Sequence, residues 1–173
     1  VKDFVLDWPS DGKKHPRLFV TRAELETRWK QQKTDPAVID ELLKHGSARS
    51  AEDIDRAYMP NWTTNFALGA YLLSGGSTEV AEKTQLLARL RQALNYELWS
   101  MQFGLAGVPT PILYDGTIDS PWIPAAERKV LRAQMAYYAY RLADPAVWSA
   151  ERGYASGNQN MTVTWEISRG ITA

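Results

Sequence analysis

Apolar residues recur at helical spacing along most of this chain, and this pattern limits the folds open to it. In the segment 78–101 they follow one another three or four positions apart, as on one face of a helix. The segments 36–46, 63–72 and 125–142 repeat the pattern. No stretch alternates apolar and polar residues as a half-buried strand does. The sequence therefore predicts an all-α fold, as a bundle, an array of helical hairpins or an (α/α) toroid.

Local signals mark where several of these helices begin and end. Thr21 and Glu24 have the spacing of a capping box, which predicts a helix start at Thr21. Asp35 and Pro36 predict a second start, because the missing N–H of proline costs nothing in a first turn. Gly46 predicts the end of that helix. Two further helices are expected over 51–58 and 161–173.

The segment 103–124 is rich in glycine and proline and interrupts the helical pattern. It predicts a long loop, with a short extended piece at 112–114. Loops of this length in compact domains are often functional or disordered. The chain is accordingly divided into an irregular N-terminal segment, 1–20, and a helical domain, 21–173.

Composition excludes several classes of function. Lys plus Arg and Asp plus Glu number 20 each, so there is no overall basic charge of the kind that favours nucleic acid. The absence of cysteine excludes disulfides, zinc–thiolate sites and thiol catalysis. No apolar run is long enough for a membrane span. Motifs for phosphate loops, dinucleotides, metalloproteases and serine hydrolases are missing, and no metal or cofactor is expected.

Two motifs, one near each end of the chain, resemble parts of a known family. The run HPRLFVT over 15–21, followed by Glu24 and by Asp35-Pro36, resembles the start of the catalytic α/α toroid in heparinase II/III-like and alginate-lyase-like polysaccharide lyases. The run SGNQNM over 156–161 is similar to an asparagine-rich loop of the same superfamily. The resemblance implies helical hairpins that form part of an incomplete (α/α) toroid.

The end of the chain favours the same interpretation. The last residues have neither a polar tail nor a helix stop, so we expect the native chain to continue beyond Ala173. Exposed apolar surface is then expected at Trp165, Ile167 or Ile171, covered by the remainder of the parent chain. A secreted or periplasmic location is expected, with a signal peptide already removed.

The family resemblance implies β-elimination on a polysaccharide that contains uronic acid. Such a reaction needs a donor that neutralises the substrate carboxylate, a base and an acid. Asn158 and Asn160 are the candidates for the neutralising donor, because an amide donates hydrogen bonds without adding a competing charge. The resemblance implies that the catalytic Tyr and His follow beyond Ala173. His15 and His45 are given local structural roles.

Candidate sugar-binding residues are polar or aromatic side chains expected at loops. An aromatic ring suits the apolar face of a pyranose, although each ring has core packing as its alternative role. The candidates are Asn61, Trp62, Asn65, Tyr114 and Trp122.

Other classes of function remain open at this point. A glycosidase on an α/α toroid needs two opposed carboxylates, for which Asp115, Asp119 and Glu166 are available. A glycan-binding module without catalysis needs only the aromatic and amide side chains. A helical interaction domain needs neither.

Overall fold

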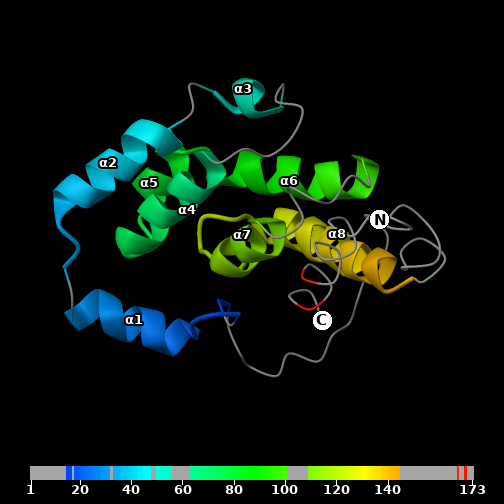
Figure 1. The fold of residues 1–173 in the computed structure, drawn as a ribbon, viewed down its shortest axis with the longest axis horizontal. Helices are drawn as coiled ribbons and strands as arrows, with labels where there is room; N and C mark the ends of the chain where they lie inside the picture. Colours follow the sequence, from blue (N-terminus) through cyan, green and yellow to red (C-terminus); the bar gives the residue numbers. More distant parts are fainter. Residues whose placement is uncertain are drawn as a thin grey trace.

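The computed structural model describes residues 15–16, 18–31, 33–47, 50–55, 63–100, 109–144, 167 and 170. Within these residues it contains helices and no strand, which confirms the predicted all-α class (Figure 1). The helices are α1 (Arg22–Gln31), α2 (Pro36–Gly46), α3 (Ala51–Asp55), α4 (Thr63–Leu73), α5 (Thr78–Lys83), α6 (Leu86–Ser100), α7 (Pro109–Thr117) and α8 (Ala125–Ala143).

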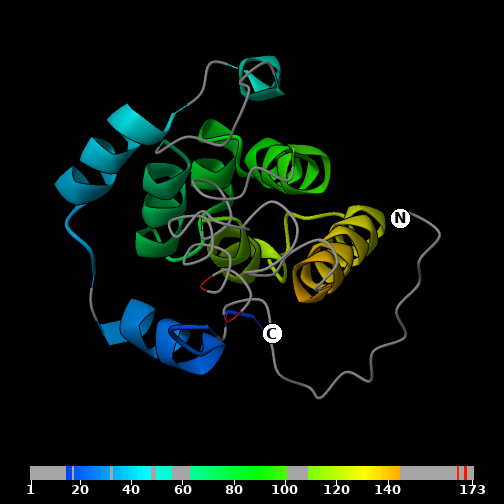
Figure 2. The same ribbon diagram turned by 45° about the vertical axis from the view of Figure 1, so that its right-hand side comes forward.

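The four helices α4, α6, α7 and α8 surround the core. α4 contacts α5, α6 and α7, and α6 contacts α7 and α8. The short helix α3 lies over α6, α2 packs along α4, and α1 lies at the edge of the molecule in both ribbon views (Figures 1 and 2). The largest fully buried side chains of the described residues include Tyr71, Leu90, Leu113, Leu131 and Tyr138, one or more from each of these four helices.

The predicted helix starts are confirmed. The Thr21 backbone N–H donates to Glu24 Oε2 at 2.8 Å, and Thr21 Oγ1 accepts from the Glu24 backbone N–H at 3.2 Å, which is a capping box. Asp35 Oδ1 accepts from Ala37 N at 2.9 Å, and Pro36 occupies the first turn of α2. Each signal satisfies backbone donors that a helix start leaves without partners.

The predicted loop over 103–124 is wrong for residues 109–117, which form α7. Pro109 and Pro111 lie in the first turn, where their missing N–H groups leave no helical hydrogen bond unmade. Gly116 lies near the end of α7, where a Cβ would be 3.0 Å from Leu68 Cδ1. Proline and glycine here allow a helix start and a close approach between helices, and the predicted extended piece at 112–114 is helical.

The single helix expected over 78–101 is two helices in the structure. α5 ends at Lys83, and α6 begins at Leu86. Between them Gln85 adopts a left-handed backbone conformation, with φ at 53°, which ends the regular helix. The buried Thr84 hydroxyl donates to Val80 O at 2.7 Å and so closes the last turn of α5.

Arg89 connects the corner between α5 and α6 to the ends of two other helices. Its guanidinium is buried and donates to Thr84 O at 2.8 Å and to Gly46 O at 2.9 Å. It also donates to the hydroxyls of Thr63 and Thr64, at 2.6 and 3.2 Å. Burial among these neutral acceptors lowers the pKa of Arg89 to about 10.

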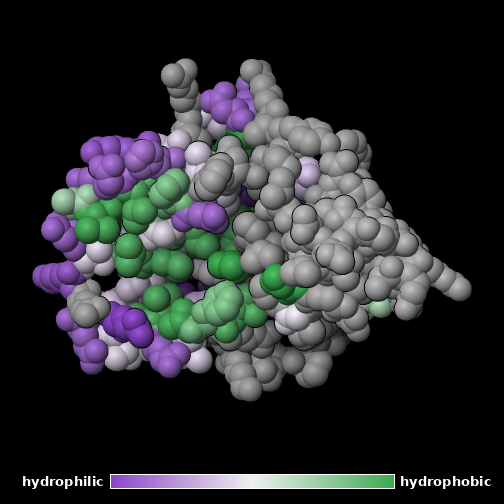
Figure 3. Space-filling view, viewed as in Figure 1, coloured by the Kyte–Doolittle hydropathy of each residue, from purple (hydrophilic) through white to green (hydrophobic). Residues whose placement is uncertain are grey.

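One face of the molecule carries hydrophobic residues on the helices α2 and α4. Figure 3 shows them gathered there, with hydrophilic residues along the outer edge. The exposed large hydrophobic side chains of these two helices are Val38, Phe66 and Leu73. Among the described residues, no helix is both long enough and apolar enough to cross a membrane.

Candidate functional site around His15

The sequence-predicted site residues fall into two groups. Asn61, Trp62, Asn158 and Asn160 lie outside the described residues. Of the other three, Asn65 is exposed on α4, whereas Tyr114 of α7 and Trp122 in the α7–α8 connection are half-buried.

Trp122 belongs to the core packing. Its ring meets Tyr71 edge-on, with ring centroids 5.7 Å apart, and it packs against the buried apolar cluster. This is the packing role that was the alternative to sugar binding. Tyr114 packs against the same cluster, and its ring also meets His15, so it lies beside the polar site described next.

His15 lies against the end of α7. Its Nδ1 is 2.6 Å from Asp115 Oδ1, and its side chain is 14 % exposed. The backbone N–H of His15 donates to Asp119 Oδ2 at 2.8 Å, and that of Leu18 donates to Asp115 Oδ2 at 3.0 Å. The two carboxylates therefore hold His15 and Leu18 against the end of α7 through three contacts.

The local fold explains why both carboxylates reach His15. Asp115 lies in the last turn of α7, and Asp119 follows just beyond it, where Ile118 N still donates to Tyr114 O at 2.8 Å. Residues four apart in such a turn lie on the same side of it. Pro16, which follows His15, is buried.

Two further groups complete the site. Arg132 of α8 donates through one terminal nitrogen to Asp119 Oδ1 at 2.8 Å, so a single carboxylate joins the guanidinium and the His15 backbone. The Tyr114 and His15 rings meet edge-on, with centroids 5.7 Å apart. The side chain of Arg132 is about half exposed, whereas that of Asp115 is buried.

This arrangement orients the imidazole for proton transfer. A carboxylate on Nδ1 favours the tautomer with its proton on Nδ1, which leaves the lone pair on Nε2. Within the described part of the chain, Nε2 makes no hydrogen bond. A histidine held in this way by Asp115 is able to accept and return a proton.

Sequence reasoning missed this site because its parts are far apart along the chain. His15 and Asp115 are separated by 100 positions, and no local spacing announces such a pair. One signal was available, since Asp115 and Asp119 are four positions apart. This spacing places the two carboxylates on one side only if the segment around them is predicted to be helical.

The geometry also bears on the glycosidase alternative. Asp115 and Asp119 both bind the His15 segment, and Asp119 also binds Arg132. Both carboxylates are therefore engaged by protein groups, whereas a glycosidase pair faces the scissile bond of its substrate. Among the residues described, no group of three or more His, Cys, Asp or Glu side chains is placed to hold a metal ion.

A second buried polar group lies in the core, at Glu97 of α6. Thr110 Oγ1 donates to Glu97 Oε1 at 3.0 Å. Burial raises the pKa of Glu97 to about 7, while the Thr110 and Tyr138 hydroxyls act in the opposite direction. Sequence reasoning had assigned no role to this residue.

Comparison with known proteins identifies no relative, since no protein-family model, no curated protein and no solved structure matches this chain.

Proposed function

We propose that this chain is part of a polysaccharide lyase, which cleaves a uronic-acid-containing polymer by β-elimination and whose helices belong to a larger (α/α) toroid. The observation that carries the proposal is the His15–Asp115 pair, with Nδ1 and Oδ1 2.6 Å apart and Nε2 without a hydrogen bond in the described residues. The all-α fold and the HPRLFVT run around His15 support it. A periplasmic or secreted location is part of the proposal.

In this reaction we assign the base to His15, in place of the residue beyond Ala173 that the family resemblance implies. Its Nε2 takes the proton from C5 of the uronate, which is acidic because C5 carries the carboxylate. The electron pair of the C5–H bond forms a double bond between C4 and C5, and the C4–O bond breaks. The leaving oxygen keeps the electron pair of the broken C4–O bond and takes a proton from an acid group. Asp115 stabilises the imidazolium that forms, and Asn158 and Asn160 are proposed to neutralise the uronate carboxylate.

The test is the ultraviolet absorbance of the unsaturated uronide, measured with this chain and with its full-length parent on a panel of uronate polymers. We expect absorbance to rise with at least one polymer for the parent. In that parent, His15→Gln is expected to lower kcat by about a hundredfold or more. His45→Gln is the matched control, because His45 is the other histidine of the chain and is exposed on α2.

Anchoring and catalysis by His15 are separated by a second readout. The thermal midpoint and circular dichroism of His15→Gln report whether the N-terminal segment still folds against α7. Loss of turnover in a folded variant supports His15 as the base. Full turnover in His15→Gln, or new reducing ends without an absorbance rise, would overturn the proposal.

A further inference from the structure

One side of α8 is exposed along most of the helix and carries cations at one end and an aromatic ring at the other. Lys129, Arg132, Ala136 and Tyr140 follow each other at spacings of three and four, which places them on one face. We call these four residues the α8 ridge. From Lys129 to Tyr140 the ridge spans about 16 Å at the helical rise per residue.

The aromatic end of the α8 ridge is ordered before any ligand arrives. Tyr140 is 67 % exposed, and its ring stacks on Tyr137 with centroids 6.4 Å apart and an interplanar angle of 23°. Tyr137 in turn contacts the Arg141 guanidinium, 5.9 Å from its ring centroid. A ring that is already held costs little conformational entropy when a ligand stacks on it.

The other end of the α8 ridge is positively charged. Lys129 is exposed and makes no ion pair with the described residues. Arg132 uses one terminal nitrogen on Asp119, and its other nitrogens make no hydrogen bond within that same part of the chain. Because Asp119 also binds the His15 backbone, this end of the ridge adjoins the candidate site.

We infer that the α8 ridge binds an acidic glycan, with the face of Tyr140 on a pyranose ring and with Lys129 and Arg132 on carboxylate or sulfate groups. The identity of the ligand rests on the proposed function, because the ridge adjoins the site where that polymer would be cleaved. The ridge itself contributes the complementary chemistry: a flat apolar ring for the C–H face of a sugar, and donors for its anions.

Two other ligand classes fit the α8 ridge less well. A protein partner needs a surface of about 800 Å² on each side, whereas the ridge offers one ring and a single line of side chains. A nucleic acid also combines stacking with anionic groups. It is disfavoured because the chain has no net positive charge, with 20 basic and 20 acidic residues.

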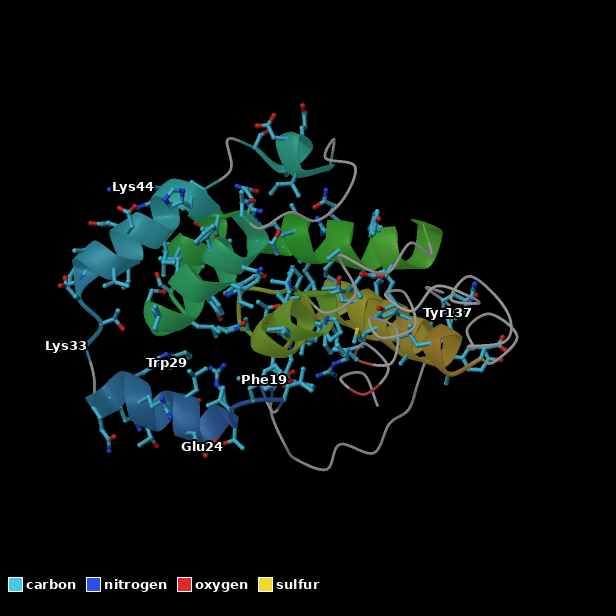
Figure 4. All side chains as sticks on the ribbon, viewed as in Figure 1. Phe19, Glu24, Trp29, Lys33, Lys44 and Tyr137 are labelled. Carbon is cyan, nitrogen blue, oxygen red and sulfur yellow. The ribbon has the colours of Figure 1, made fainter. Side chains whose placement is uncertain are left out.

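The experiment measures binding alone, by calorimetry on the full chain. The probes are acidic tetrasaccharides from alginate, polygalacturonate, heparan sulfate and chondroitin, with cellotetraose as the neutral sugar and a short single-stranded DNA as the competing class. The ridge variants are Tyr140→Ala and Lys129→Gln. Their matched controls are Phe66→Ala and Lys33→Gln, exposed residues on and before other helices (Figure 4 shows Lys33 far from Tyr137).

We expect one acidic tetrasaccharide to bind, and Tyr140→Ala to weaken it by about tenfold, the size expected for one stacked ring. Lys129→Gln is expected to weaken it by about threefold and to reduce its salt dependence. The controls should bind as the unaltered chain does. Equal binding by ridge and control variants, stronger binding of DNA, or no binding of any acidic tetrasaccharide would overturn the inference.

The inference and the proposed function fail in different ways. His15 lies off the ridge, so His15→Gln is expected to lower kcat by about a hundredfold or more while binding persists. Binding without any absorbance rise would support glycan binding by the α8 ridge and contradict the proposed lyase function. An absorbance rise together with unaltered binding by Tyr140→Ala would support the lyase function and contradict glycan binding by the α8 ridge.

Discussion

Glu97 is the buried carboxylate whose charge the fold disfavours most clearly among the described residues. Its side chain lies in the core and bonds Thr110 at 3.0 Å, and its pKa is raised from 4.5 to about 7. The folded protein therefore binds more protons than the unfolded chain between these two pH values. By linkage, the contribution of Glu97 to the free energy of unfolding is most favourable below about pH 4.5. This contribution is lost as the pH rises through about 7.

We predict that Glu97→Gln stabilises the protein at about pH 8 but not at about pH 4. The amide keeps the size of the side chain and never ionises, so the gain approaches the full cost of ionising Glu97, about 3 kcal/mol. Urea unfolding at the two pH values measures the difference. Glu82→Gln, an exposed residue of α5, is the control and should change neither value. An equal gain at both pH values would contradict the titration of Glu97.

For single residues of the candidate site, the sequence indicated Tyr114 and missed the partner of His15. Tyr114 was predicted to belong to a site and lies against His15. His15 was assigned a local role, yet its partner is Asp115, on a helix far along the chain. Residue type indicates what a side chain is able to do, whereas its partners depend on how distant segments pack.

The contact between α2 and α4 depends on a missing side chain. A Cβ on Gly46 would lie 2.7 Å from the Ala67 backbone nitrogen, closer than real contacts allow. Gly69 of α4 also faces α2, but there a Cβ would lie 3.7 Å from Leu42 Cδ1, an ordinary distance. The same helix pair thus contains one glycine that the packing requires and one that it does not.

We predict opposite effects of two matched substitutions on this contact. Gly46→Ala should destabilise the protein by about 2 kcal/mol, because α2 must move away from the α4 backbone. Gly69→Ala should stabilise it by about 0.5–1 kcal/mol, because alanine favours a helix interior. Urea unfolding of the two variants measures both. Destabilisation by Gly69→Ala as large as that by Gly46→Ala would show that the close approach is not the cause.

Helix boundaries were predicted best where the signal is local. The capping box at Thr21 and the Asp35-Pro36 start depend on neighbouring atoms, and both are confirmed. α7 was missed because glycine and proline usually end helices, whereas here the prolines occupy a first turn. The break at Gln85 was missed because the apolar spacing continues across it. The toroid itself stays a prediction.

At the scale of the whole molecule, α1 is the described helix with the fewest contacts to other helices. Leu25 is its one buried residue. Trp29 Nε1 donates to Leu72 O at 2.6 Å, and its ring lies 3.2 Å from the position that a Cβ on Gly76 would occupy. α6, in contrast, contributes several fully buried leucines to the core.

We therefore predict that α1 opens more readily than the core. In hydrogen exchange, amides of α1 should be less protected than those of α6, because local opening exposes little apolar surface. Trp29→Ala should lower protection in α1 and leave α6 nearly unchanged. Arg28→Ala, on the exposed side of α1, is the control. Equal loss of protection in both helices would mean that α1 unfolds only with the whole molecule.

The buried Arg89 has a consequence for the order of events in folding. Its acceptors, Gly46 O and the Thr63 hydroxyl, lie 43 and 26 positions away and belong to separate helices. The guanidinium therefore cannot be satisfied until α2, α4 and α6 have met, after the loops between them have closed. We expect such contacts to be largely absent from the folding transition state, so that Arg89 lowers the unfolding rate and has little effect on the folding rate.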